Sequence, residues 1–228
     1  MSQEIPLRMI LLIPLIILVS YLVGSIPFGL VIVRLKTGKD IRQIESGRTG
    51  GTNAMRAAGW GAGILTAVLD TCNATVCVWL ARWIFPDYYW LHVLAPTVAI
   101  IGHNYSIYLI ERGEKGWVHL RGGAGGAPSV GGSIGLWFPS LFFIVPLGGL
   151  LLYFVGYASV ATMGTAAISF LIFLYRAWIG VSPWEYVFYG LIAEIVLILA
   201  LRPNIKRLFK GNERLVGWRA RRKKTSQL

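Results

Sequence analysis

Residues 40–56 read DIRQIESGRTGGTNAMR, and this polar stretch separates two strongly apolar ones, residues 10–33 and 60–84. A helix needs about 20 apolar residues to cross the hydrocarbon core of a bilayer, so each flanking stretch is long enough to span a membrane. The whole chain agrees, because only 14% of its 228 residues are charged and 55% are hydrophobic, whereas soluble domains carry about 25% charged residues. The composition predicts an integral membrane protein.

Five more apolar stretches follow, at residues 91–110, 127–137, 141–155, 159–175 and 184–201. The stretch 127–137 is short and rich in glycine, so it either crosses the membrane or re-enters from one side. Basic residues gather in three segments, 34–56, 112–121 and 202–224, and basic loops favour the cytoplasmic side. All three basic segments lie on the cytoplasmic side only if the short stretch 127–137 crosses the membrane. We expect an all-α, polytopic membrane helical bundle with about seven transmembrane segments, one of them short.

The chain has no long linker and no evident internal repeat. We therefore expect a single membrane domain over residues 1–228, with a basic cytoplasmic tail at about residues 202–228. Gly24, Ser25 and Pro27 interrupt the first apolar stretch and predict a break in its helix. Asp70 is costly when it stands alone in lipid, so we expect it to face the interior of the bundle.

The net charge of +12 and a sequence pI near 10.1 would suit a nucleic-acid-binding protein. Here, however, the basic residues adjoin apolar spans, where they set topology and attract an anionic leaflet. We expect the lipid bilayer as a partner and no nucleic acid. Cys72 and Cys77 share one apolar stretch, and the three histidines are scattered. Neither pattern has the spacing of a metal site, so we expect no metal and no cofactor.

The polar stretch has the composition of a phosphate site. Gly47, Gly50 and Gly51 admit backbone angles closed to other residues and let a ligand approach main-chain N–H groups. Its side chains add neutral donors and fixed positive charge suited to phosphate; they are Ser46, Thr49, Thr52, Asn53, Arg42, Arg48 and Arg56. The stretch is either a phosphate-binding loop or a solvated loop whose basic residues serve topology alone.

Several motifs occur along the chain in a recognisable order. They are GSIPFG at 24–29, SGRTGGTN at 46–53 with Arg56, GH at 102–103, GYASV at 156–160, and RPNIKRL at 202–208 with Gly211 and Glu213. Together they resemble the bacterial acyl-phosphate:glycerol-3-phosphate acyltransferases, small multi-span membrane enzymes. The resemblance implies transfer of an acyl group from acyl phosphate to the sn-1 hydroxyl of glycerol 3-phosphate. The products are lysophosphatidic acid and phosphate, for phospholipid synthesis. It also implies a bacterial plasma membrane location, with the active site facing the cytoplasm.

The same resemblance assigns roles to individual residues. The implied catalytic residues are Ser46, Lys115, Ser159 and Asn204. The implied substrate-binding residues are Gly47, Gly50, Gly51, Thr52, Asn53, Arg56, His103, Gly116 and Glu213. Both substrates, acyl phosphate and glycerol 3-phosphate, are anions, so the first requirement of such a site is positive charge and N–H donors.

The chain departs from the family pattern at several positions. The family's second motif carries a lysine within a glycine run, and two stretches compete for it here. Residues 112–116 keep the family spacing and place the lysine at Lys115, whereas residues 121–129 match more residues but require an insertion and place Ala124 there. Leu201 stands where the family has a histidine. The sequence leaves two alternatives to this enzyme open. One is a transporter of an anionic solute, and the other is an inactive paralogue that binds lipid phosphate.

Overall fold

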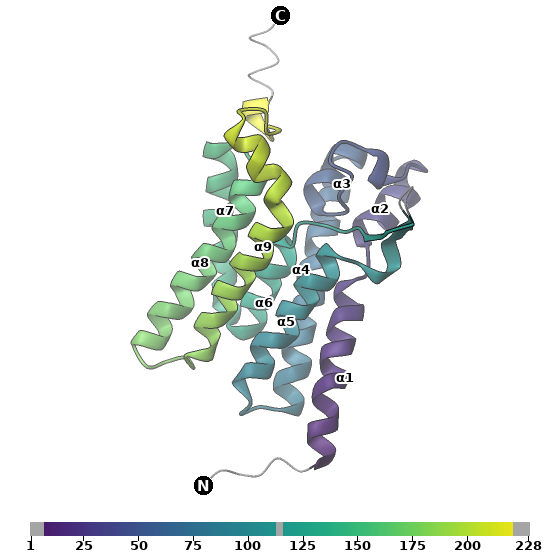
Figure 1. The fold of residues 1–228 in the computed structure, drawn as a ribbon. Coiled ribbons are helices and arrows are strands. Elements are labelled where there is room, and N and C mark those ends of the chain that lie inside the picture. The colour runs from purple at the N-terminus through teal and green to yellow at the C-terminus, as the bar shows by residue number, and fades with distance from the viewer. Residues whose placement is uncertain (1–6, 113–115, 221–228) are drawn as a thin grey trace, which may run out of the picture.

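A computed structural model describes residues 7–112 and 116–220, and it shows one bundle of helices (Figure 1). The helices are α1 Leu7–Gly24, α2 Phe28–Thr37, α3 Gly51–Ala58, α4 Trp60–Ile84, α5 Tyr89–Asn104, α6 Gly126–Leu136, α7 Leu141–Val155, α8 Ala158–Trp178 and α9 Glu185–Phe209. Shorter elements are the 3-10 helices η1 Ile41–Gln43, η2 Ile107–Leu109 and η3 Phe138–Ser140, and the strands β1 Ile110–Arg112 and β2 Val118–Leu120. The expected helical membrane fold is confirmed.

Five helical stretches of the described chain are long and apolar enough to cross a membrane. They are Leu11–Thr37, Trp60–Ile84, Phe138–Val155, Ala158–Trp178 and Glu185–Phe209. The helices α5, with 16 residues, and α6, with 11, are shorter than this. The count of seven crossings therefore remains a prediction.

The short helix α6 lies against the second half of α4. The Thr71 hydroxyl donates to the Ala127 carbonyl at the start of α6 (3.2 Å), and Arg82 donates to the Gly135 carbonyl at its end (2.9 Å). Small residues make this approach possible, because a Cβ at Gly131 would collide with the Thr71 carbonyl. Close packing through small residues is typical of membrane helices. The helix α6 thus begins partway along α4 and reaches the end of α4 that carries Arg82.

The first apolar stretch breaks where its sequence predicted. The helix α1 ends at Gly24 and α2 begins at Phe28, with Pro27 immediately before α2. A side chain at Gly24 would collide with the Ala99 carbonyl of α5, so the glycine allows the two helices to touch. Because the break ends α1, the following chain is free to turn over the end of the bundle.

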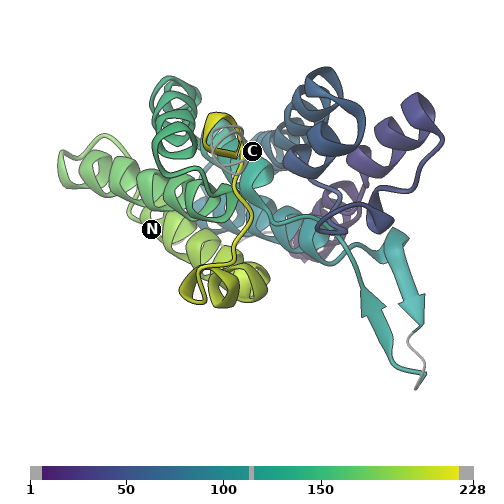
Figure 2. The same ribbon diagram turned by 90° about the horizontal axis from the view of Figure 1, so that it is seen from above.

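The stretch 91–110 does not stay helical to its end, which corrects the expected third span. The helix α5 stops at Asn104, and β1 and β2 then pair in an antiparallel hairpin with Glu111 opposite His119. The Glu111 carboxylate holds the hairpin to the bundle, because it pairs with Arg121 (2.6 Å) and Arg42 (3.3 Å). Figure 2 shows the hairpin projecting sideways from the helices.

The described residues of the three basic segments lie at one end of the bundle. Figure 1 places α2, α3, the hairpin and the C-terminal end of α9 together, with the α4–α5 and α8–α9 turns at the opposite end. The core that joins the long helices includes Val78, Ile100, Phe173, Tyr189 and Leu197, all fully buried. This packing brings loops that are distant in sequence together at the basic end.

Candidate active site

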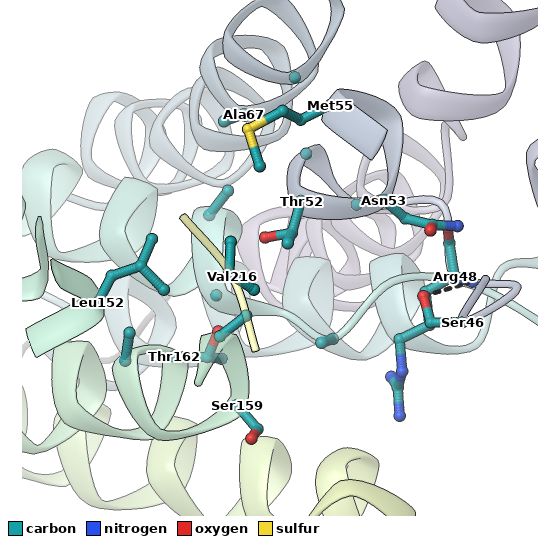
Figure 3. Close-up of a pocket in the computed structure, with 18 of the residues that line it drawn as sticks. Ser46, Arg48, Thr52, Asn53, Met55, Ala67, Leu152, Ser159, Thr162 and Val216 are labelled. Atoms are coloured by element: carbon teal, nitrogen blue, oxygen red, sulfur yellow. Dashed lines mark hydrogen bonds between the residues drawn. The ribbon is translucent and has the colours of Figure 1, made fainter. Parts of the chain in front are cut away.

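A cavity of about 450 Å³ lies at the basic end of the bundle. Its wall comes from the loop before α3, from α3 and α4, from the glycine run before α6, from the start of α8, and from residues 201–217. Figure 3 shows Ser46 and Arg48 on one side of the cavity and Leu152 on the other. The wall therefore carries both polar and apolar side chains, with the Arg48 guanidinium and the Leu152 side chain on opposite sides (Figure 3).

Most of the residues predicted from the sequence line this cavity. They are Ser46, Gly50, Gly51, Thr52, Asn53, Arg56, His103, Ser159, Asn204 and Glu213. Gly47 instead lines a neighbouring cavity of about 270 Å³, which shares Ser46 and Arg48 with the first. Gly116 is exposed in the hairpin and lines neither cavity. Lys115 lies outside the described residues.

Asn53 holds the polar loop in shape. Its Nδ2 donates to the carbonyls of Ile41 (3.2 Å), Ile44 (3.0 Å) and Arg48 (2.8 Å), and the residue is only 3% exposed. Gly47 permits the turn between them, with a positive φ of 67°. The described contacts make Asn53 a brace of the loop, although the sequence predicted it as a substrate ligand.

The second glycine run packs directly behind the loop. The Thr49 N–H donates to the Gly122 carbonyl (3.3 Å), and the Gly123 N–H donates to the His103 carbonyl (2.8 Å). A Cβ at Gly123 would collide with the His103 imidazole, so only glycine fits there. Ala124 follows and lines the cavity. Of the two competing stretches, the one containing Ala124 forms part of the cavity wall.

Three arginines, Arg48, Arg56 and Arg214, bring positive charge to the wall, and the first two belong to the polar loop and α3. The Arg56 guanidinium makes no hydrogen bond or ion pair with any residue that the structure describes. Arg48 donates to the carbonyls of Gly123 (2.7 Å) and Ala200 (2.6 Å) and, more weakly, to Asn204 Oδ1 (3.4 Å). Burial lowers the pKa of Arg48 and of Arg56 from their ordinary values, yet guanidinium groups stay charged in proteins.

The end of α9 is fixed by a buried carboxylate. Asn204 Nδ2 donates to Glu213 Oε1 (2.8 Å), and Arg207 Nε donates to Glu213 Oε2 (3.0 Å). The Glu213 side chain is only 4% exposed. Glu213 therefore orients Asn204 and pairs with Arg207 of the same helix end.

Four buried side-chain oxygens of the cavity wall make no hydrogen bond within residues 7–112 and 116–220. They are Asn53 Oδ1, both Asp70 carboxylate oxygens and Ser159 Oγ at the start of α8. Asp70 faces the bundle interior, as predicted, and is 1% exposed. The Nδ1 atom of His103 lies 3.7 Å from Asp70 Oδ1. Unpaired buried polar groups of this kind are typical of sites that receive a ligand.

Comparison with known proteins places this cavity in a family. The family model described as glycerol-3-phosphate acyltransferase matches residues 14–211. This chain belongs to that family. The acyltransferase is 32% identical over 207 residues to glycerol-3-phosphate acyltransferase 2 of Moorella thermoacetica, covering 90% of this chain and 98% of the relative. It is 33% identical over 204 residues to the glycerol-3-phosphate acyltransferase of Thermus thermophilus, covering 90% and 95%.

Its fold is also similar to a solved one. The crystal structure of PlsY (YgiH), an integral membrane glycerol 3-phosphate acyltransferase, in the glycerol 3-phosphate form superposes with a TM-score of 0.76. The two chains are 28% identical, and the match covers 90% of this acyltransferase and 96% of PlsY. The acyltransferase described here is thus a multi-pass membrane enzyme.

Sequence reasoning missed two features of the acyltransferase's cavity. Arg48 was recognised as a basic residue of the loop but was not assigned a catalytic or substrate-binding role. The apolar part of the wall was not foreseen at all; it includes Met55, Trp60, Ile64, Leu152 and Val216. These residues come from five separate positions along the chain, and no local pattern brings them together.

Proposed function

We propose that this acyltransferase transfers an acyl group from acyl phosphate to the sn-1 hydroxyl of glycerol 3-phosphate, giving lysophosphatidic acid and phosphate. The names of its relatives support the acceptor. So do the PlsY structures, which are described as a glycerol 3-phosphate form and a lysophosphatidic acid form.

The observation that carries the proposal is the amphipathic wall of the cavity. Its apolar part includes Trp60 and Ile64, which are 63% and 59% exposed on the outer surface of α4. The polar part contains Arg48 and Arg56. A substrate with an alkyl chain and a phosphate head fits this division, because the chain remains among apolar side chains while the phosphate meets guanidinium groups.

Several polar residues have suitable positions to hold the two anionic substrates. Arg56 has free donors, and the Gly50–Gly51 backbone begins α3, so its first N–H groups have no partner within the helix. Asn204, held by Glu213, lines the same cavity, as does the Ser159 hydroxyl, which has no hydrogen-bond partner among the described residues. We assign the loop to acyl phosphate and Asn204 with Ser159 to glycerol 3-phosphate. Ser46 and Lys115 keep the catalytic roles that the resemblance implies, Lys115 lying outside the described residues.

The chemistry needs little beyond positioning. An acyl phosphate is a mixed anhydride, so the hydroxyl oxygen attacks its carbonyl carbon and the bond from that carbon to the phosphate oxygen breaks. The departing phosphate accepts the hydroxyl proton, since a phosphate dianion is basic near neutral pH. Orientation of two reactants in one site contributes about 7–11 kcal/mol in favourable cases, and the arginines stabilise charge on the phosphate.

The location follows from charge. Arg48, Arg56 and Arg214 of the basic segments line the cavity, and basic loops of bacterial membrane proteins face the cytoplasm. We therefore place the active site at the cytoplasmic face of the bacterial plasma membrane. There it meets soluble glycerol 3-phosphate and a lipid-like donor at one surface, an arrangement that does not need the midplane site typical of a transporter.

The test is an assay of the purified protein in detergent with an acyl phosphate and glycerol 3-phosphate. We expect release of phosphate and formation of lysophosphatidate in equal amounts, and no turnover with acyl-coenzyme A. Arg56→Gln should lower kcat/KM by about tenfold or more, the worth of one charge-assisted contact. Arg112→Gln, the same substitution on the exposed hairpin, should change nothing. Turnover with acyl-coenzyme A alone would refute the proposal.

One further candidate has specific support. Ala124 stands at the family lysine if residues 121–129 are the matching stretch, and Leu201 stands at the family histidine; both line the cavity. No lysine is among the described residues of its wall. An inactive paralogue would bind lysophosphatidate or glycerol 3-phosphate and release no phosphate from the acyl donor. The same assay, run beside a binding measurement, separates this candidate from the enzyme.

A further inference from the structure

Arg48 occupies an unusual position for a charged residue. Its guanidinium joins three segments far apart in sequence, because it lies in the polar loop and donates to Gly123 of the glycine run and to Ala200 of α9. It also belongs to the wall of both cavities at the basic end. These contacts fix the group in place before any ligand arrives.

The charge of Arg48 has no counter-ion in the described part of the chain. Its acceptors are two backbone carbonyls and the amide oxygen of Asn204, and the carboxylate of Glu213 is already paired with Arg207. The Arg48 side chain is half-buried, and this burial lowers the pKa of its guanidinium. A partly buried charge that has no ion-pair partner among the described residues would be stabilised by an anion in the cavity.

The guanidinium also has donors to spare. A guanidinium carries five N–H groups, and the three hydrogen bonds of Arg48 use three of them. The remaining two N–H groups, on Nε and Nη1, point in different directions, so each can donate a separate hydrogen bond to an anion. The other cations of the cavity wall differ, because Arg214 is 40% exposed and pairs with Glu45 (3.6 Å), while Arg56 is unpaired but not anchored.

We infer that Arg48 is a phosphate-binding residue of this cavity, held ready by the carbonyls of Gly123 and Ala200. Those two carbonyls directly precede Ala124 and Leu201, which both line the cavity, so the guanidinium is held at the cavity wall. The inference rests on the proposed function for the identity of the phosphate, which is the headgroup of a substrate or the phosphate product.

The experiment measures binding of inorganic phosphate apart from turnover. Thermal unfolding in detergent is measured over a series of phosphate concentrations for the purified wild-type protein and for Arg48→Gln, Arg48→Lys and Arg112→Gln. The apparent affinity for phosphate is taken from the rise in melting temperature. Arg112→Gln is the matched control, since Arg112 is exposed on the hairpin and lies in neither cavity wall.

We expect Arg48→Gln to weaken phosphate binding by about ten- to a hundredfold, the equivalent of one charged hydrogen-bonded contact. Arg48→Lys should recover part of the affinity, because it restores charge without the planar fork. Arg112→Gln should match wild type. If Arg48→Gln does not fold, Arg48→Lys carries the test with a smaller loss of affinity.

A merely structural Arg48 gives a different pattern. Its replacement would lower the melting temperature without phosphate but leave the apparent phosphate affinity unchanged, and that result would overturn the inference. Failure of the proposed function is separate, because phosphate binding needs no acyl transfer. A protein that loses phosphate affinity in Arg48→Gln yet has no activity with acyl phosphate retains the inference and refutes the proposed donor.

Discussion

Asn53 tests whether the polar loop is shaped by its own side chains or by the substrate. Its Nδ2 donates to the carbonyls of Ile41, Ile44 and Arg48 at 3.2, 3.0 and 2.8 Å. Because Nδ2 carries two hydrogens, Asn53→Ala removes the equivalent of two hydrogen bonds, each worth about 0.5–1.5 kcal/mol net. We expect the free energy of unfolding to fall by about 1–3 kcal/mol.

The assay combines thermal unfolding in detergent with steady-state kinetics. Asn53→Ala should lower the melting temperature and raise KM for both substrates, because the loop that carries Ser46 and Arg48 loses its brace. Asn53→Asp is close in size but cannot donate, and its negative charge would face the same carbonyls. We therefore expect Asn53→Asp to be less stable than Asn53→Ala.

Thr52 is the natural control, since it is the preceding residue of the same helix. It lines the cavity but makes no side-chain hydrogen bond within the described chain. Thr52→Ala should raise KM while the melting temperature stays near that of wild type. If Asn53→Ala also raises KM while its melting temperature stays near that of wild type, Asn53 does not brace the loop. That result would mean that Asn53 contacts the substrate directly.

Three other predictions concern the packing of Gly123 in the cavity wall, the position that matches the family lysine, and the orientation of the chain in the membrane. Gly123→Ala should destabilise the protein by about 1–3 kcal/mol, as overpacking usually does, because the new Cβ collides with the His103 ring. Gly61→Ala is the control and should be tolerated, because the space around its Cβ is open. Equal melting temperatures for the two variants would contradict the predicted collision at Gly123. Lys115→Ala should lower kcat/KM by about tenfold or more, whereas near-wild-type turnover would move the family match to the run containing Ala124. For the topology, each new cysteine is introduced into a protein that lacks the two native cysteines. Tyr88→Cys should react with an impermeant label added outside intact cells, and Lys39→Cys should not. The reverse labelling would overturn the proposed orientation of the chain in the membrane.

The sequence by itself determined the class of fold and most of the site. Apolar stretches such as 60–84 have to be helical in a membrane, because only internal hydrogen bonds can satisfy the backbone there. Polar residues between such stretches have to lie at the surface of the bilayer, so the loop 40–56 and the end of α9 were foreseeable as neighbours of the membrane face. Motif order then identified Ser46, Arg56, Ser159 and Asn204 as candidates, and all four line the cavity.

The contacts that these residues make are visible only in the tertiary structure. The sequence could not show that Asn53 bonds to its own loop, because its partners are carbonyl groups, and every residue has one. Nor could it show that the chain leaves the third apolar stretch as a hairpin, since the Glu111 pairs with Arg42 and Arg121 that hold it depend on approach in space. Arg48 illustrates the limit most clearly: its contact with Ala200 spans 152 residues, and no local pattern of side chains encodes a distance of that kind.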